Sequence, residues 1–463
     1  MAPDTSRRAQ AGAAAVFAIA LAVRLAAFVA AQPWQPAVER EVVLTSDGLG
    51  YHTLALALLE RGEFSLERGG PPETLRTPGY PLALAAVYAI AGPRPWVAIA
   101  LQLVLQCVTC CWLYRAALRS GDVAGGLFTG GLLAIDPAFV IHGCGLWSET
   151  IFVALLVGAL GLLAATPASR SLAPAAMLLG LATLVRPAGL FAAPGVLAFV
   201  ALRYRRRPRK LLAAGCLTLA CFAAPLVPWM ARNLAVNGRA ALSSAGPFNL
   251  LFLTVARMER GPGDPSGERT RERLRAESAL GETSARPFEI ADRWAQVAWS
   301  HAASGPIDFA RALAEGVGGG LANLGTTEWS RALRLAPGLL EDGAVSGWLR
   351  RARRYAELKG PAALLLAAVA AAHLLLLYLG AAAALRPALA TRNPRPAWAA
   401  LCLGAGFLAS LCIAGNARLR LPLAACLALL AGQAQYPTWA MRLPSLTRAR
   451  RLRERASEKS GGC

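Results

Sequence analysis

Apolar segments long enough to cross a membrane recur along most of this chain of 463 residues. A helix needs about 20 apolar residues to span a bilayer, and such runs occupy 11–31, 96–118, 211–230 and 362–385, among others. Charged residues make up only 16% of the chain, whereas a soluble protein of this length would carry about 25%. The sequence therefore predicts an all-α polytopic membrane protein.

The positions of arginine and lysine predict the topology. Cytoplasmic loops collect these residues, and the net charge of +21 is concentrated in a few clusters. Arg7 and Arg8 precede the first span, "YRRRPRK" occupies 204–210, and "TRARRLRERASEK" lies near the C-terminus. Placing these clusters inside gives about ten spans with both termini in the cytoplasm. The clusters are explained by topology, so we predict membrane lipids and no nucleic acid as partners, in a bacterial inner membrane.

Two apolar segments depart from a simple span. Residues 78–91 give only about 14 apolar positions, too few to cross, so we expect an interfacial helix on the outer face. Residues 172–202 are apolar throughout except for Arg186-Pro187 at the middle. Proline breaks the helical ladder, and an arginine at that depth is costly unless it lines a polar cavity. We predict two short helices that meet at Arg186.

The chain divides into four parts on this topology. We predict an N-terminal bundle with a first outer loop, then one larger periplasmic region, then C-terminal spans, then a basic cytoplasmic tail. The ranges are 1–253 with the outer loop at 33–95, 254–360, 361–436 and 437–463.

Polar groups gather on the outer face of the predicted bundle. The stretch "LTSDGLGYHTLALALLERG" at 44–62 places one carboxylate, Asp47, before an amphipathic helix. A carboxylate can take the proton of an attacking hydroxyl, and arginines can neutralise a departing phosphate. We predict Asp47 and Glu149 as catalytic and the following as substrate-binding: Arg76, Tyr51, Tyr80, Arg186, Arg232, Asn233, Arg418 and Arg420.

Each of these residues also has a structural explanation. Asp47 and Glu149 fall in the first turn of a predicted helix, where the helix dipole favours a carboxylate. Arg76 and one of Arg418 and Arg420 fit ordinary interfacial arginines, and Tyr51 lies on the apolar face of its helix.

Motifs for metals and cofactors are absent from the sequence. There is no GxxxxGK[ST], HExxH or GxSxG pattern. Most of the ten cysteines lie within apolar segments without a zinc-like spacing. We therefore predict neither a metal nor a cofactor.

Five motifs in order carry a resemblance to a known family. The first is "SDGLGYHTLALALLERGEF" with "LRTPGYPLALAAVYAIAG"; the others are "DPAFVIHGCGLWSETIF", "GLATLVRPAGLF", "PWMARNLAVNGRAALSSAGPFNLLF" and "NARLRLPLAA". Together they resemble GT-C glycosyltransferases of family 39. The resemblance implies a GT-C helical bundle, an inverting reaction, a polyprenyl-phosphate sugar donor and Asp47 as catalytic base.

Two departures from the family leave the substrates open. The protein mannosyltransferases carry Asp-Glu where this chain has Asp47-Gly48. The aminoarabinose transferases carry lysine before a double proline, where this chain has Arg76-Thr77-Pro78. Neither branch therefore assigns the sugar or the acceptor.

The predicted function is hexosyl or pentosyl transfer from a polyprenyl phosphate to a hydroxyl of a protein, lipid or glycan outside the membrane. One alternative is a transporter or lipid flippase, which would show inverted repeats; we find none in the sequence. The other is a polysaccharide ligase or polymerase, which would lack the Asp47 loop.

Overall fold

The computed structural model describes residues 3–119, 122–165, 168–261, 263–264, 267–279, 286–334, 348–390 and 393–433. Within these ranges the chain is helical, and its β structure is limited to one isolated bridge between Ser65 and Pro72. The predicted all-α class is thus confirmed. The predicted basic tail at 437–463 lies outside the described residues.

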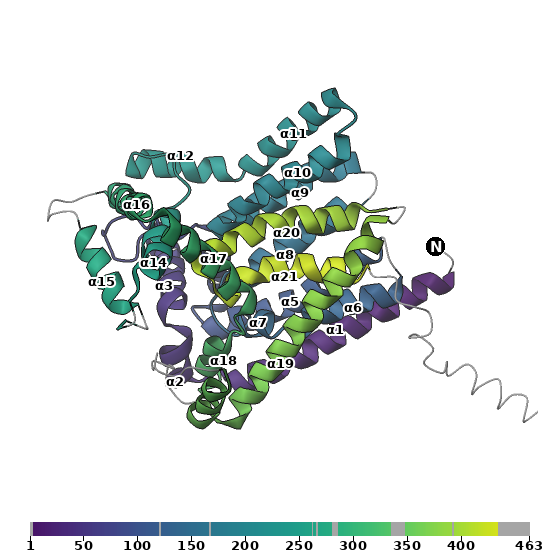
Figure 1. Cartoon of the computed structure of the whole chain (residues 1–463), viewed down its shortest axis with the longest axis horizontal. Helices are drawn as coiled ribbons and strands as arrows, with labels where there is room; N and C mark the ends of the chain where they lie inside the picture. Colours follow the sequence, from purple (N-terminus) through teal and green to yellow (C-terminus); the bar gives the residue numbers. More distant parts are fainter. Residues whose placement is uncertain are drawn as a thin grey trace, which may run out of the picture.

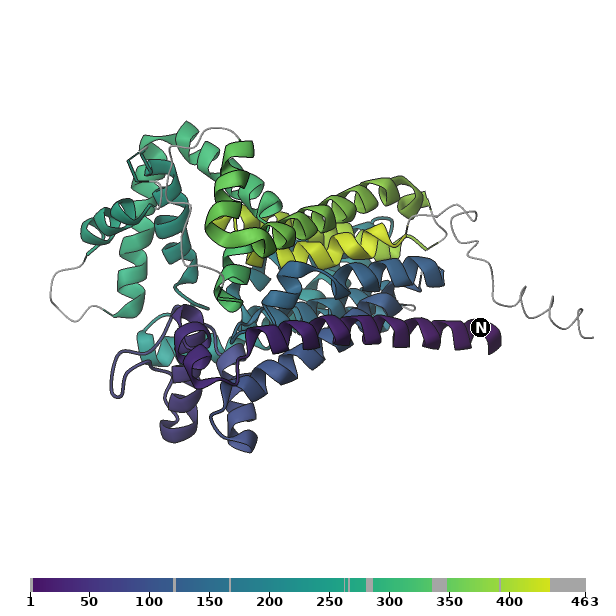
Figure 2. The same ribbon diagram turned by 90° about the horizontal axis from the view of Figure 1, so that it is seen from below.

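A bundle of helices runs along the long axis of the molecule (Figures 1 and 2). Helix α8 packs on α5 and α9, α20 packs on α21 and α10, and α1 packs on α5 and α6. Most of the buried apolar side chains belong to one continuous core between these helices. The bundle comprises α1 (Pro3–Ala31), α5 (Pro95–Ala117), α6 (Val123–Ala134), α8 (Glu149–Ala164), α9 (Ala168–Val185), α10 (Ala192–Tyr204), α11 (Pro208–Ala223), α19 (Trp348–Ala390), α20 (Arg395–Ala414) and α21 (Ala417–Ala431).

Shorter helices gather at the end of the bundle that lies away from the N-terminus (Figures 1 and 2). They connect the long helices and form the surroundings of the candidate site. They are α2 (Pro36–Val38), η1 (Glu39–Val43), α3 (Ser46–Arg61), α4 (Gly79–Ala91), α7 (Pro137–Ile141), η2 (Pro187–Phe191), α12 (Leu226–Asn237), α13 (Ala245–Asn249), η3 (Leu250–Val255), α14 (Ala256–Glu259), α15 (Glu268–Glu277), α16 (Pro287–Ser304), α17 (Pro306–Ala322) and α18 (Thr326–Ala332).

Five helices of the described chain are long and apolar enough to cross a membrane, or up to seven if two bent helix pairs are each one span. This is fewer than the predicted ten or so. Part of the difference lies in apolar helices of 10–17 residues that were predicted to span, including α6 and α8, which fall short of the usual spanning length of about 20.

A buried arginine fastens the first helix to its neighbours. Arg24 of α1 is fully buried. Its Nε donates to Gln106 Oε1 at 3.1 Å, and its Nη2 donates to the Leu133 carbonyl at 3.4 Å. A further bond runs from Nη1 to the carbonyl of Ala134. An arginine among apolar helices is tolerated only with such partners, so Arg24 fixes α1 against α5 and the end of α6.

The helices at 245–309 build a second, smaller core. Leu251, Phe252, Leu274 and Val297 are among its buried members. Helix α17 then leads back and packs on α20. An added Cβ at Gly316 would lie 2.2 Å from the Cys412 carbonyl oxygen, so the two helices touch backbone to backbone. Small residues allow this close approach.

Candidate active site

Asp47 lies at the start of α3, at the bundle end that carries the short helices. Thr45 is extended, Ser46 has a φ of 49°, and Asp47 falls in the first helical turn. A positive φ at a serine is uncommon and tends to mark functional sites. The Asp47 side chain keeps 36% of its surface exposed, so its carboxylate is accessible from outside.

Two glycines beside Asp47 make room for its neighbours. An added Cβ at Gly48 would lie 2.2 Å from the Val43 carbonyl oxygen. At Gly50 it would lie 2.6 Å from the guanidinium carbon of Arg76. The glycines of the "SDGLG" stretch therefore allow the preceding turn and an arginine to pack directly on the helix.

Two arginines hold the Asp47 carboxylate, one on each oxygen. Arg76 Nη2 donates to Oδ1 at 3.3 Å, and Arg418 Nη1 donates to Oδ2 at 2.8 Å. Arg76 is itself oriented by Glu73, whose Oε2 lies 3.5 Å from Nη1. Burial raises the pKa of the Asp47 carboxyl, but the charges of Arg418 and Arg76 outweigh it, and the net pKa is lowered. Asp47 is therefore ionised at neutral pH.

A second carboxylate lies behind the first. Glu149 opens α8, with only 2% of its side chain exposed. Its Oε1 accepts from both Arg186 and Arg418. Arg186 Nη1 also donates to Ser148 Oγ at 3.1 Å. Arg418 therefore bridges Asp47 and Glu149, and Arg186 is held at the break between α9 and η2. The predicted helix break at Arg186-Pro187 is confirmed.

These side chains surround a cavity of about 290 Å³. Asp47 and three arginines supply its charged wall, and residues of α13, η3 and α21 complete it. The lining residues are Asp47, Tyr51, Leu75, Arg76, Thr77, Arg186, Pro187, Ala188, Ala245, Phe248, Asn249, Leu253, Asn416, Arg418 and Leu419. The cavity thus offers one exposed carboxylate beside several guanidinium groups, a combination that suits an anionic ligand and a proton acceptor in one place.

Aromatic rings support the charged groups. The Arg76 guanidinium lies over the Tyr51 ring at 5.6 Å, and that of Arg418 over the Trp147 ring at 6.0 Å. Tyr51 meets Tyr80 edge to face at 4.6 Å. Tyr51 lines the cavity, whereas the Tyr80 hydroxyl donates to Gln102 Oε1 at 2.6 Å. Tyr80 therefore supports Tyr51 from inside the protein.

Five of the predicted site residues are not among those that line the cavity: Tyr80, described above, and Glu149, Arg232, Asn233 and Arg420. Glu149 is behind the arginines. Arg232 stacks on Trp229 at 4.9 Å, and the Asn233 amide donates to the Ala241 carbonyl at 2.8 Å. Arg420 donates to the backbone carbonyls of Gly320 and Asn323. The contacts of Asn233 and Arg420 connect loops and helices.

Sequence reasoning did not select Glu73, Trp147 or Ser148. Glu73 Oε1 accepts from the backbone N–H groups of Leu75 and Arg76 at 2.6 and 3.1 Å. The sequence could have indicated Glu73, because it is a carboxylate three residues before Arg76 in a turn. Ser148 accepts from Arg186, and its position next to Glu149 was the signal there.

No group of three or more His, Cys, Asp or Glu side chains in the described part of the chain is placed to hold a metal ion.

No protein-family model and no curated protein matches the chain. Among solved structures, the apo oligosaccharyltransferase of Archaeoglobus fulgidus is similar at 14% identity with a TM-score of 0.50, covering 94% of this chain and 51% of that one. The chain has a GT-C fold. It spans about half the length of this archaeal enzyme, so the likeness establishes the fold alone.

Two further structures are similar at lower scores. AglB from A. fulgidus, in complex with an inhibitory peptide and a dolichol-phosphate, has 13% identity and a TM-score of 0.45, covering 96% of this chain and 52% of that one. ArnT from Cupriavidus metallidurans, bound to undecaprenyl phosphate, has 16% identity and a TM-score of 0.41, covering 91% and 77%.

Proposed function

We propose that this integral membrane protein is an inverting glycosyltransferase that moves a hexose or pentose from a polyprenyl phosphate to a hydroxyl acceptor. The observation that carries the proposal is the Asp47 carboxylate, exposed in a cavity and held by Arg76 and Arg418. The GT-C fold supports it. So do the solved neighbours, one of which is described with dolichol-phosphate and another with undecaprenyl phosphate.

The proposed step is a single displacement at the anomeric carbon. The acceptor oxygen forms a bond to that carbon while the bond to the phosphate oxygen breaks, and the phosphate leaves with the electron pair. The acceptor proton passes to Asp47. Each Asp47 oxygen accepts one arginine bond, which leaves a lone pair for this proton. Because the pKa of Asp47 is lowered, its carboxylate takes the proton late, once bonding to the anomeric carbon has made the hydroxyl more acidic.

Arginines of the cavity neutralise the phosphate. Arg76 and Arg186 line it with partly exposed guanidinium groups, at 15% and 16% of their side-chain surface. Charge that develops on the leaving oxygen is stabilised by donors already in place. Glu149 contributes by orienting Arg186 and Arg418, since its carboxylate is behind them and 2% exposed.

The proposed orientation places this cavity in the periplasm. The basic turn at 204–210 lies at the other end of α10, about 20 Å away for a helix of 13 residues. The positive-inside rule assigns such a turn to the cytoplasm, so the cavity faces outward from a bacterial inner membrane.

The test uses purified protein in nanodiscs with a panel of radiolabelled polyprenyl-phosphate hexoses and pentoses. Donor binding and release of the sugar are measured separately. We expect one donor to bind and to be consumed, and Arg76→Gln to weaken its binding. Absence of binding by every donor would contradict the proposal. Mass spectrometry of glycans and glycoproteins from a strain lacking the protein then identifies the acceptor.

A further inference from the structure

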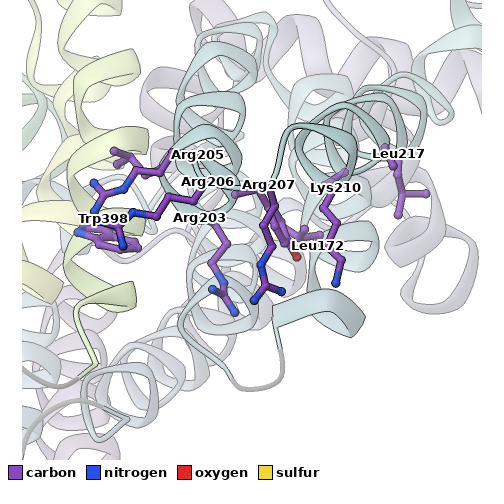
Figure 3. Close-up of a pocket in the computed structure, with 12 residues that line it drawn as sticks. Leu172, Arg203, Arg205, Arg206, Arg207, Lys210, Leu217 and Trp398 are labelled. Carbon is purple, nitrogen blue, oxygen red and sulfur yellow. The ribbon is translucent and has the colours of Figure 1, made fainter.

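A second cavity lies at the opposite end of the bundle, in the turn between α10 and α11. Its volume is about 780 Å³. Figure 3 shows Arg203, Arg207 and Lys210 with their charged ends pointing the same way, and Arg205 and Arg206 extending toward Trp398. The cavity is lined by Leu172, Leu202, Arg203, Tyr204, Arg205, Arg206, Arg207, Lys210, Ala213, Ala214, Leu217 and Trp398.

The cations of this cavity have no acid to balance them. The lining includes five basic side chains and no Asp or Glu. Within the described ranges, Arg203 Nε is buried without a hydrogen-bond partner, and so is Nη1 of nearby Arg395 on α20. The two like charges also act on each other. Buried donors that lack a partner are costly, and an anion in the cavity would offer an acceptor to Arg203, which lines it.

The backbone of the turn adds to the positive charge. Helix α11 has 16 residues and begins at Pro208, with Arg207 as an N-cap whose side chain makes no cap bond. The first N–H groups of a helix have no intrahelical partner, and the helix dipole favours an anion there. Such an N-terminus is a ready phosphate site when basic side chains surround it.

The remaining wall of the cavity is apolar. Leu172, Leu202, Leu217 and Trp398 line it. Leu212 and Leu219, on the same helix α11, are 70% and 48% exposed, so this helix presents an apolar surface beside the basic turn. A ligand that fits both parts has a phosphate head and a hydrocarbon body.

We propose that this cavity binds the phosphate of an anionic phospholipid, at the end of the bundle away from Asp47. The arginines and the α11 N-terminus hold the phosphate, and the acyl chains follow α11. Basic pockets between membrane helices are suited to such headgroups. Inorganic phosphate carries the same charged group as the lipid head but cannot contact the apolar wall. Binding of inorganic phosphate and of the phospholipid can therefore be distinguished experimentally. The site does not depend on the proposed transferase activity.

The experiment is native mass spectrometry of the full chain after delipidation, titrated with phosphatidylglycerol, phosphatidylcholine or inorganic phosphate. The test variant is Arg203→Gln with Arg207→Gln. The control, Arg170→Gln with Arg209→Gln, removes the same charge from exposed residues outside the cavity lining. A second test variant, Arg206→Gln with Lys210→Gln, serves if the first does not fold.

We expect phosphatidylglycerol to bind to the wild type and the control. Either test variant should weaken this binding by about 25-fold, since each basic residue near a lipid surface is worth about a factor of five and each variant removes two. Equal weakening in the control would show diffuse charge attraction and would overturn the proposal. Equal binding of phosphatidylcholine would also overturn it. Binding of inorganic phosphate without the lipid would assign the site to a soluble anion and refute the lipid.

Discussion

Arg418 is the residue whose replacement tests the architecture of the candidate site most fully. It bridges two carboxylates: Nη1 lies 2.8 Å from Asp47 Oδ2, and Nε donates to Glu149 Oε1. Removing one partner of a buried ion pair costs about 3–5 kcal/mol. Arg418 is 21% exposed, and Arg76 and Arg186 still face the two carboxylates in its absence. For Arg418→Gln we therefore expect a cost just below this range, about 2–3 kcal/mol.

A lysine at this position should give an intermediate result. One ammonium keeps the charge but cannot bridge two separate carboxylates as a guanidinium does. Arg418→Lys should thus lose about half as much, roughly 1–1.5 kcal/mol. The measurement is the thermal unfolding midpoint in nanodiscs. We expect it to fall by about 2–3 °C for the glutamine variant, since about 1 kcal/mol shifts the midpoint of a chain of 463 residues by about 1 °C. Arg311→Gln, whose arginine is 66% exposed, should leave the midpoint unchanged.

The same variants should move the pH dependence of turnover. After burial, Arg418 is the strongest influence on the pKa of Asp47, and it lowers that pKa. Turnover requires ionised Asp47 and is lost as the pH falls through its pKa. Arg418→Gln raises that pKa, so the acid limb of kcat/KM should shift to higher pH. If Arg418→Gln kept the unfolding midpoint of the wild type and the same acid limb of kcat/KM, the bridging arrangement would be refuted.

Two further predictions concern regions outside the site. Gly316→Val should separate α17 from α20 and lower the unfolding midpoint, because its Cβ would meet the Cys412 carbonyl oxygen at 2.2 Å. Gly318 of the same helix has open space, and alanine favours a helix over glycine, so Gly318→Ala should not lower the midpoint. Equal midpoints would refute the close packing. Burial lowers the pKa of His301, but its bonds to two glutamates outweigh this and raise it. The local stability of α16 should therefore be fully present below about pH 6.5 and be lost as the pH rises through the raised value; hydrogen exchange should show this in the wild type and not in His301→Gln.

The helical class and the break at Arg186 followed from the sequence because both depend on local physics. Runs of apolar residues must form helices in a membrane, and a proline after an arginine interrupts a helix wherever it lies. The number of spans did not follow, because α6 and α8 are shorter than a standard span. The apolar run that begins at Val123 continues past the end of α6 into the short helix α7, and the sequence did not reveal the break between them at Asp136-Pro137.

The site could be predicted only in part, because the packing of the helices decides which charged side chains reach the cavity. Asp47, Arg76, Arg186 and Arg418 carried charge in otherwise apolar or small-residue settings, and the structure brings all four together. Arg420 carried the same signal but turns toward the carbonyls of Gly320 and Asn323. Two arginines spaced i and i+2 on a helix point in different directions, and only the packing of α17 decides which one meets the cavity.

The most direct measurement of the central claim is turnover by Asp47→Asn, with donor binding recorded on the same nanodisc preparation. Asparagine keeps the shape of the side chain but cannot accept the proton of the hydroxyl. We expect turnover to fall by about 10²- to 10⁴-fold, as is usual when a general base is lost. Donor binding should persist, because arginines hold the phosphate. Near-normal turnover would contradict the account and leave Asp47 as a carboxylate that only orients Arg76 and Arg418.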